Sequence, residues 1–173
     1  MPDEMGAPPQ IDAVSIDDYL DVMSKAVFQS GISWRVIEAK WPSTREAFHG
    51  FDAKRVASMS EREIDALVQD TRVIRNRRKL EAVVGNAARM LELDAQHGSF
   101  KAYLRSAPDF EETVQSLRKN FKFMGEMGCY YFLWVVKEPV PPYHEWAEAR
   151  NRPAPPARSR PALAEGAPRG RRR

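Results

Sequence analysis

The sequence is poor in the residues that form disulfides and metal sites. Its 173 residues include one cysteine, Cys129, and three histidines, at positions 49, 97 and 144. A single cysteine cannot form an internal disulfide, and no Cys/His spacing typical of a zinc site is present. Phosphate-binding loops and dinucleotide fingerprints are also missing. We therefore expect neither a metal nor a cofactor.

Long apolar runs are missing as well. No stretch approaches the ~20 apolar residues that a membrane helix requires. Residues 1–11 lack the basic-then-apolar order of a signal peptide. The sequence therefore predicts a cytoplasmic protein that does not contact membranes. Its length fits one domain, which we expect to be a monomer.

Charge is distributed unevenly around a net value of +3. Residues 1–21 hold six acids and no lysine or arginine, whereas residues 151–173 hold seven arginines, one acid and five prolines. We expect residues 1–14 to be a flexible acidic N-terminus, residues 151–173 a disordered Pro/Arg-rich tail, and residues 15–150 the folded domain. A basic tail adds affinity for phosphate backbones, although a solvated extension explains its composition equally well.

Apolar periodicity predicts helices throughout residues 15–150. The strongest signal is a buried face at positions 80, 83, 84, 87, 88 and 91, which ends at Gly98. A capping box at residues 60–63 begins the preceding helix, and Ser15 with Asp18 resembles another. Residues 33–40 predict a helix that ends before Pro42.

The later part of the chain continues this helical pattern. Residues 100–104 and 110–117 predict short helices, the second capped by Asp109 after Pro108. The apolar run at residues 130–136 is compatible with a buried strand or a core helix. Because no partner strand is evident, we interpret it as a helix after Gly125. The fold prediction is an all-α domain.

A basic connection between two of these helices is the clearest candidate for ligand binding. Residues 69–79 carry five cations: Arg72, Arg75, Arg77, Arg78 and Lys79. The following helix starts within this segment, and a helix start presents free N–H groups to an anion. The pattern therefore predicts phosphate binding. A solvated helix face is the alternative explanation.

Four segments resemble the DNA-3-methyladenine glycosylase I family, which belongs to the helix-hairpin-helix DNA glycosylases. Residues 28–34, Phe-Gln-Ser-Gly-Ile-Ser-Trp, are similar to the glutamine- and Gly-Leu-Ser-Trp-containing segment of that family. Residues 47–59, 67–87 and 121–130 are similar to its second segment, its hairpin with the following helix, and its Phe-Lys-Phe-Val-Gly segment. The resemblance covers about two thirds of the chain and implies a helix-hairpin-helix glycosylase fold.

The resemblance also implies an activity and a base pocket. The family hydrolyses the N-glycosidic bond of alkylated purines in double-stranded DNA, after the damaged base has left the helical stack. By this resemblance Trp34 is the aromatic wall of the pocket, and Gln29 and Ser33 are its polar groups. A core position on an amphipathic helix is the alternative for Trp34.

The sequence also departs from the family. The family glutamate that contacts the damaged base corresponds to Ala26, and the adjacent positions, Lys25 and Val27, provide no carboxylate. The N-terminal segments with pocket aromatics and zinc ligands have no counterpart, and no cysteine follows His144. The catalytic group is therefore unknown. A glycosylase with altered selectivity and a non-catalytic DNA-binding or interaction module are both compatible with this pattern.

Overall fold

The computed structural model describes residues 7–151, and every regular element in this range is helical. These residues contain no β-strand, so the all-α prediction is confirmed. A compact unit extends to Pro141, and Pro142 begins a second unit that carries α9 (Tyr143–Asn151). The boundary predicted at residue 150 falls at the end of α9. The proposed disordered tail lies almost wholly outside the described residues.

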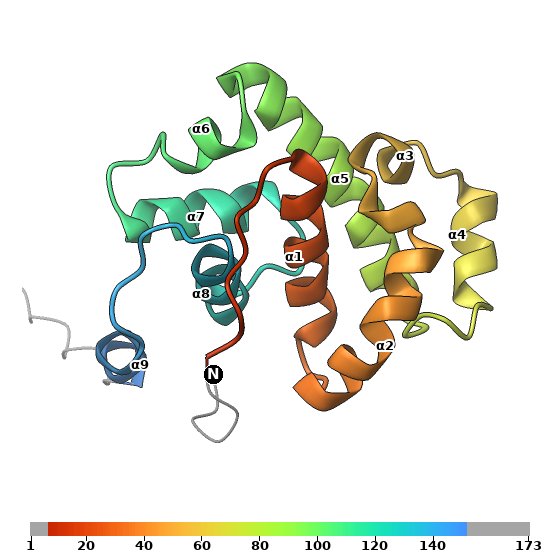
Figure 1. The fold of residues 1–173 in the computed structure, drawn as a ribbon, viewed down its shortest axis with the longest axis horizontal. Helices are drawn as coiled ribbons and strands as arrows, with labels where there is room; N and C mark the ends of the chain where they lie inside the picture. Colours follow the sequence, from red (N-terminus) through yellow and green to blue (C-terminus); the bar gives the residue numbers. More distant parts are fainter. Residues whose placement is uncertain (1–6, 152–173) are drawn as a thin grey trace, which may run out of the picture. The chain divides into compact units, whose positions relative to one another are not determined.

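Helix α1 (Ile16–Gln29) is the centre of the compact unit (Figure 1). Its buried residues, from Tyr19 to Phe28, cover most of its circumference, and the remaining face carries the partly exposed Asp21 and Lys25. It packs against α2 (Trp34–Ala47), α5 (Arg77–His97) and α8 (Glu126–Val135). The Asp18 carboxylate accepts the backbone N–H groups of Val14 and Ser15, so the predicted capping contact from Asp18 is confirmed.

Helix α2 differs from its prediction because it continues through Pro42 to Ala47. Proline removes one backbone donor and usually interrupts a helix. Here the buried face of α2 runs across it, with Ile37 and Trp41 before Pro42 and Thr44 and Ala47 after it. Hydrophobic packing on both sides of the proline therefore favours one continuous helix over a break.

Short elements lead from α2 to the long helix α5. A 3₁₀ turn (His49–Phe51) and α3 (Ala53–Ala57) precede α4 (Glu61–Val68), which starts at the predicted capping box: Ser60 Oγ accepts Glu63 N–H, and the Glu63 carboxylate accepts Ser60 N–H. The 21 residues of α5 span about 30 Å. Gly98 ends α5 as predicted, and its φ of 84° lies in the left-handed region.

The remaining helices close the unit against α5 and α1. Helix α6 (Phe100–Leu104) packs on α5, and α7 (Phe110–Asn120) packs on α8. Asp109 caps α7 by accepting the Glu112 N–H group, and the apolar run around residue 130 is the buried helix α8. Both predictions are confirmed. No helix within residues 7–151 is long and apolar enough to cross a membrane.

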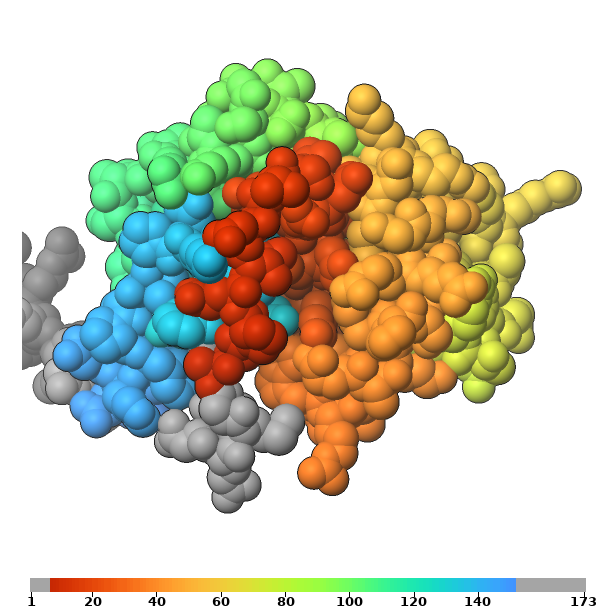
Figure 2. All heavy atoms as spheres, in the orientation of Figure 1, coloured from red at the N-terminus to blue at the C-terminus, as the bar shows by residue number. Residues whose placement is uncertain are grey.

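Part of the predicted flexible N-terminus, the segment before α1, makes hydrogen bonds to α8. Ile11 N–H donates to Val135 O at 2.8 Å, and Gln10 Nε2 donates to Trp134 O at 2.9 Å. Residues 1–6 lie outside the described part of the chain. Figure 2 shows this segment (red) beside α1, with the surface hollowed between it and α2 (orange).

Candidate DNA interface and base site

The connection between α4 and α5 is a hairpin, residues 69–76, that is fastened to α2. Lys40 Nζ donates to Thr71 O at 2.6 Å, and Ser43 Oγ donates to Arg72 O at 2.7 Å. Val73 is buried beneath the turn. These contacts hold the backbone of the hairpin in one position relative to the core.

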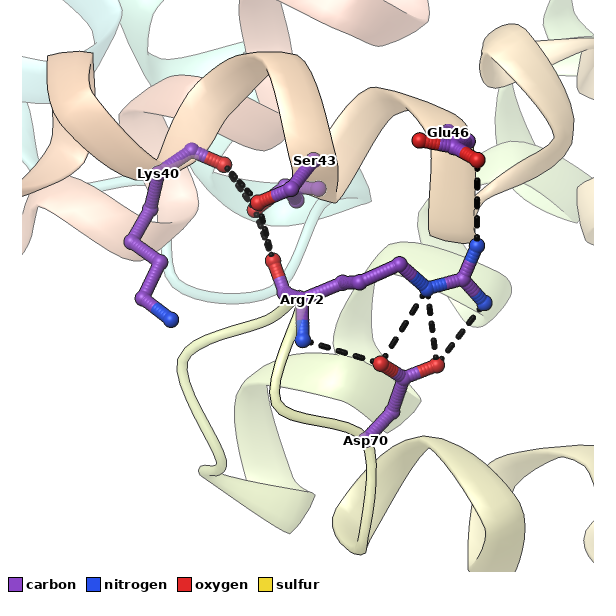
Figure 3. Close-up of polar contacts among 6 residues, drawn as sticks. Lys40, Ser43, Glu46, Asp70 and Arg72 are labelled. Atoms are coloured by element: carbon purple, nitrogen blue, oxygen red, sulfur yellow. Dashed lines mark hydrogen bonds and ion pairs between the residues drawn. The ribbon is translucent and has the colours of Figure 1, made fainter.

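Arg72 supports the hairpin with its side chain (Figure 3). Its Nε and Nη2 groups donate to both carboxylate oxygens of Asp70, and its third nitrogen, Nη1, lies 3.8 Å from Glu46 Oε1 of α2. The Asp70 carboxylate also accepts Arg72 N–H. Hydrogen bonds from Arg72 lower the pKa of Asp70 from its usual value, which keeps this pair ionised.

The predicted phosphate-binding cations separate into two groups. Arg77, in the first turn of α5, pairs with Asp65 of α4 and with Glu81, the latter at 3.2 Å. Arg75 and Arg78 are exposed and make no ion pair with a carboxylate of residues 7–151. Arg75 and Arg78 are therefore the members of the predicted group whose charges are least compensated.

Lys79 lies in the interior and contacts the protein backbone. It is 5% exposed, and its Nζ donates to Phe28 O at 3.1 Å and to Ser30 O at 2.5 Å. Burial lowers the pKa of its ammonium. These carbonyls belong to the C-terminal end of α1, where unpaired carbonyls favour a cation. Lys79 therefore joins the start of α5 to the α1–α2 turn.

The α1–α2 turn carries the residues that the sequence places in a base pocket. Gln29 ends α1 and is half-buried. Ser33 caps α2 by accepting Val36 N–H at 3.4 Å. Trp34 is the first residue of α2 and is also half-buried. The three residues thus lie in or next to one turn, which Lys79 ties to the start of α5.

Tyr131 of α8 lies against Trp34, and sequence reasoning did not identify it. The ring centroids are 4.6 Å apart with an interplanar angle of 49°. Burial raises the pKa of the Tyr131 hydroxyl, so this ring is neutral. A base stacked on the same face of Trp34 would have to displace Tyr131. No local pattern signals this contact, because α2 and α8 are distant in sequence and come together only because both pack on α1.

Ala26, which the sequence resemblance assigns to the position of the family glutamate, faces α8. It is 2% exposed, and a Cβ built on Gly128 would lie 3.8 Å from Ala26 Cβ and 3.9 Å from Met124 Sδ. The position is therefore packed against another helix.

A cavity of about 360 Å³ lies near Tyr131 between α1, α2 and the N-terminal segment. Asp21 and Glu38 line it, and both carboxylates have cationic partners. Asp21 accepts Arg45 Nε at 2.8 Å and Trp41 Nε1 at 2.7 Å, while Glu38 lies 2.6 Å from Lys25 Nζ. Charge inside this cavity is thus largely compensated by the protein itself.

The described residues do not fit a zinc site. Residues 7–151 contain no group of three or more His, Cys, Asp and Glu side chains arranged to hold a metal ion. Cys129 is fully buried in α8, and desolvation raises the pKa of its thiol to about 12. Such a thiol stays protonated near neutral pH and is a poor ligand or nucleophile.

Fold and site together define a helical domain in which the α4–α5 hairpin leads into the start of α5. The start of α5 contacts the α1–α2 turn, which carries Trp34. A family model described as methyladenine glycosylase matches residues 14–124. The chain belongs to the methyladenine glycosylase family.

Named relatives and solved structures agree with this assignment. The chain is 36% identical over 126 residues to a DNA-3-methyladenine glycosylase of Haemophilus influenzae, covering 61% of this chain and 68% of that protein. Identity to DNA-3-methyladenine glycosylase 1 of Escherichia coli is 31% over 126 residues, covering 61% and 67%.

A crystal structure of 3-methyladenine DNA glycosylase I matches with a TM-score of 0.64 and 26% identity, over 73% of this chain and 81% of that one. The Staphylococcus aureus 3-methyladenine DNA glycosylase I matches with a TM-score of 0.64 and 25% identity, over 73% and 78%. The predicted helix-hairpin-helix glycosylase-like fold is confirmed.

Proposed function

We propose that this protein is a DNA N-glycosylase that flips an alkylated purine out of double-stranded DNA and hydrolyses its glycosidic bond. The observation that carries the proposal is the Lys79 bridge, which holds the α1–α2 turn and the start of α5 together. A protein that removes a base needs a pocket placed beside its contacts with the DNA backbone. Relatives and structural neighbours named as 3-methyladenine glycosylases support the same activity.

The residues have distinct roles in this proposal. Arg75 and Arg78 contact phosphates, while Arg72 and Arg77 hold the hairpin in shape and Lys79 positions the pocket turn. Trp34 provides the stacking surface and Gln29 a hydrogen-bonding group for the base edge. Ser33 has an indirect role, because its hydroxyl caps the start of α2. The protein acts in the cytoplasm as a monomer, without a metal or cofactor.

Ala26 shapes the expected selectivity. N3-alkylated adenine is cationic, and its glycosidic bond is already weak, so binding the cation and holding it flipped provides much of the catalysis. Losing a charged partner for a cation costs ~1.5–3 kcal/mol, or about ten- to 150-fold in affinity. We therefore expect weak release of 3-methyladenine or a preference for an uncharged lesion.

A base-release assay on alkylated duplex DNA tests the proposal. Wild type should release a modified base, and Trp34→Ala should reduce release about fivefold or more, because a stacked base contributes ~1–3 kcal/mol. Trp34→Phe keeps a flat ring and should retain more activity than Trp34→Ala. Equal release by Trp34→Ala and wild type would remove Trp34 from the site.

A non-catalytic DNA-binding module is the second candidate, and the packing of Ala26 against α8 favours it. In this case wild type would bind duplex DNA but release no base from any alkylated substrate. The same assay, run beside a binding measurement, therefore separates the two candidates.

A further inference from the structure

The turn between α7 and α8, residues 121–125, is locked onto the middle of α5. Asn86 of α5 is 2% exposed, and its amide forms two hydrogen bonds with Lys122. Asn86 Nδ2 donates to Lys122 O at 3.1 Å, and Asn86 Oδ1 accepts Lys122 N–H at 2.9 Å. A buried side chain thus fixes the backbone of an exposed turn.

Phe123 in this turn is unusual in exposure and in backbone conformation. It is 38% exposed, and it is the one aromatic residue among the exposed large hydrophobics of residues 7–151. Its φ of 59° lies in the left-handed region, which is strained for a bulky side chain. The hydrogen bonds between Asn86 and Lys122 therefore hold the neighbouring Phe123 ring in solvent, although its backbone conformation is strained.

One cation lies beside this ring, and three more are within five residues of it in sequence. The Arg78 guanidinium of α5 lies 5.9 Å from the Phe123 ring centroid. Lys119 and Lys122 are exposed and make no ion pair with a carboxylate of the described residues, and Arg118 lies 3.5 Å from Glu126. The α7–α8 surface, defined as Arg78, Arg118, Lys119, Lys122 and Phe123, therefore combines an exposed ring with uncompensated positive charge.

A hollow of about 450 Å³ connects this surface to the candidate base site. Arg118, Lys119 and Phe123 line it together with Ser30 of the α1–α2 turn. Ser30 O is also the acceptor of Lys79 Nζ. The α7–α8 surface and the turn that carries Gln29 and Trp34 thus border the same hollow.

We propose that the α7–α8 surface is a second DNA contact, in which Phe123 stacks on a base of the opened duplex while Lys119 and Lys122 bind phosphates. Aromatic rings flanked by cations fit unpaired nucleotides, because every base offers a π-face and every link a phosphate. A flipped nucleotide leaves neighbouring bases partly unstacked. The inference rests on the proposed function, because it assumes that the protein opens DNA.

Binding of the full chain to two duplexes tests the proposal by fluorescence anisotropy. One duplex is intact, and the other carries a tetrahydrofuran abasic-site analogue, which leaves the adjacent bases incompletely stacked. Phe123→Ala should weaken binding to the abasic duplex about fivefold or more and change binding to the intact duplex much less. Phe123→Trp should retain or tighten abasic-duplex binding, and melting temperatures check that both variants fold.

Charge variants separate the two roles on this surface. Lys119→Gln with Lys122→Gln should weaken binding to both duplexes and lower the salt slope of log affinity by about 2. Lys101→Gln is the single-charge control. Lys101 lies in α6, which begins after the C-terminal end of α5, whereas Arg78 of the proposed surface lies in the first turn of α5.

Three outcomes decide the inference. Equal abasic-duplex affinity of Phe123→Ala and wild type would overturn the stacking contact, even where wild type releases bases normally. Unchanged salt slopes in the double lysine variant would overturn the phosphate contact. Absence of DNA binding by wild type would overturn the proposed function and this inference together.

Discussion

The ammonium of Lys79 stabilises the site by capping α1 from a different helix. The last turn of α1 contains no basic residue, and Lys79 contacts the carbonyls of Phe28 and Ser30 near its end. A cation at this end of a helix interacts favourably with the unpaired carbonyls and the helix dipole. The same contact sets the distance between the α1–α2 turn and α5.

Lys79→Met tests this role directly. The variant keeps an apolar stem of similar length but leaves two carbonyls without their donor, which should cost ~1–3 kcal/mol of unfolding free energy. Chemical denaturation measures the loss, with exposed Arg78→Met as the control that should change stability little. A stable Lys79→Met protein with a reduced salt slope for DNA binding would instead assign Lys79 to phosphate contact.

The helical spacing around Lys79 predicts that this residue is buried, although its charge alone suggests exposure. The run from Arg75 to Lys79 predicts a solvated or phosphate-binding face, but Lys79 stands four residues before Val83 and seven before Asn86. Both of these residues are buried. Residues at this spacing share one face of a helix. By contrast, the Trp34–Tyr131 contact arises because α2 and α8 both pack on α1, and no spacing within either helix predicts it.

At the scale of elements, the hairpin is a rigid support with a small number of uncompensated charges.

The local capping signals at Ser60 and Gly98 are sufficient to predict α4 and the end of α5, because each acts within a few residues. The prediction that α2 ends before Pro42 is wrong, because the tertiary packing of Trp41 and Thr44 outweighs the missing backbone donor. Element boundaries are therefore predictable where local contacts dominate.

Arg75 and Arg72 should affect DNA binding through different mechanisms. Arg75→Gln removes an exposed charge and should lower the salt slope by about 0.9 without changing stability. Arg72→Gln removes the bonds to Asp70 and the contact with Glu46, so it should chiefly loosen the hairpin. Anisotropy titrations at several salt concentrations measure the slope, and thermal melting measures stability.

Lys101→Gln is the matched control, because it also removes one exposed charge but lies away from the hairpin. The salt slope of this variant should stay close to that of wild type. A slope for Arg75→Gln equal to that of Lys101→Gln would exclude Arg75 from the phosphate contacts. The hairpin would then support the site without binding DNA through this residue.

At the scale of the whole molecule, the sequence places positive charge outside the compact unit as well as on the proposed DNA face. Residues 152–173 contain seven arginines and one glutamate, whereas the chain as a whole has a net charge of +3. Exposed charges separated from DNA by more than about 10 Å are largely screened at 0.1 M salt. We therefore expect the tail to act only where it reaches the phosphate backbone.

Removal of residues 152–173 should lower nonspecific DNA affinity, most visibly at low salt, because phosphate contacts release bound counterions. The melting temperature should change little, because α9 ends at Asn151 and the truncation leaves every described helix intact. A full-length variant with the seven tail arginines changed to glutamine is the matched control, and it should lose the same affinity if charge is the cause. A large drop in melting temperature on truncation, with none in the glutamine variant, would instead mean that the tail contributes packing to the folded protein.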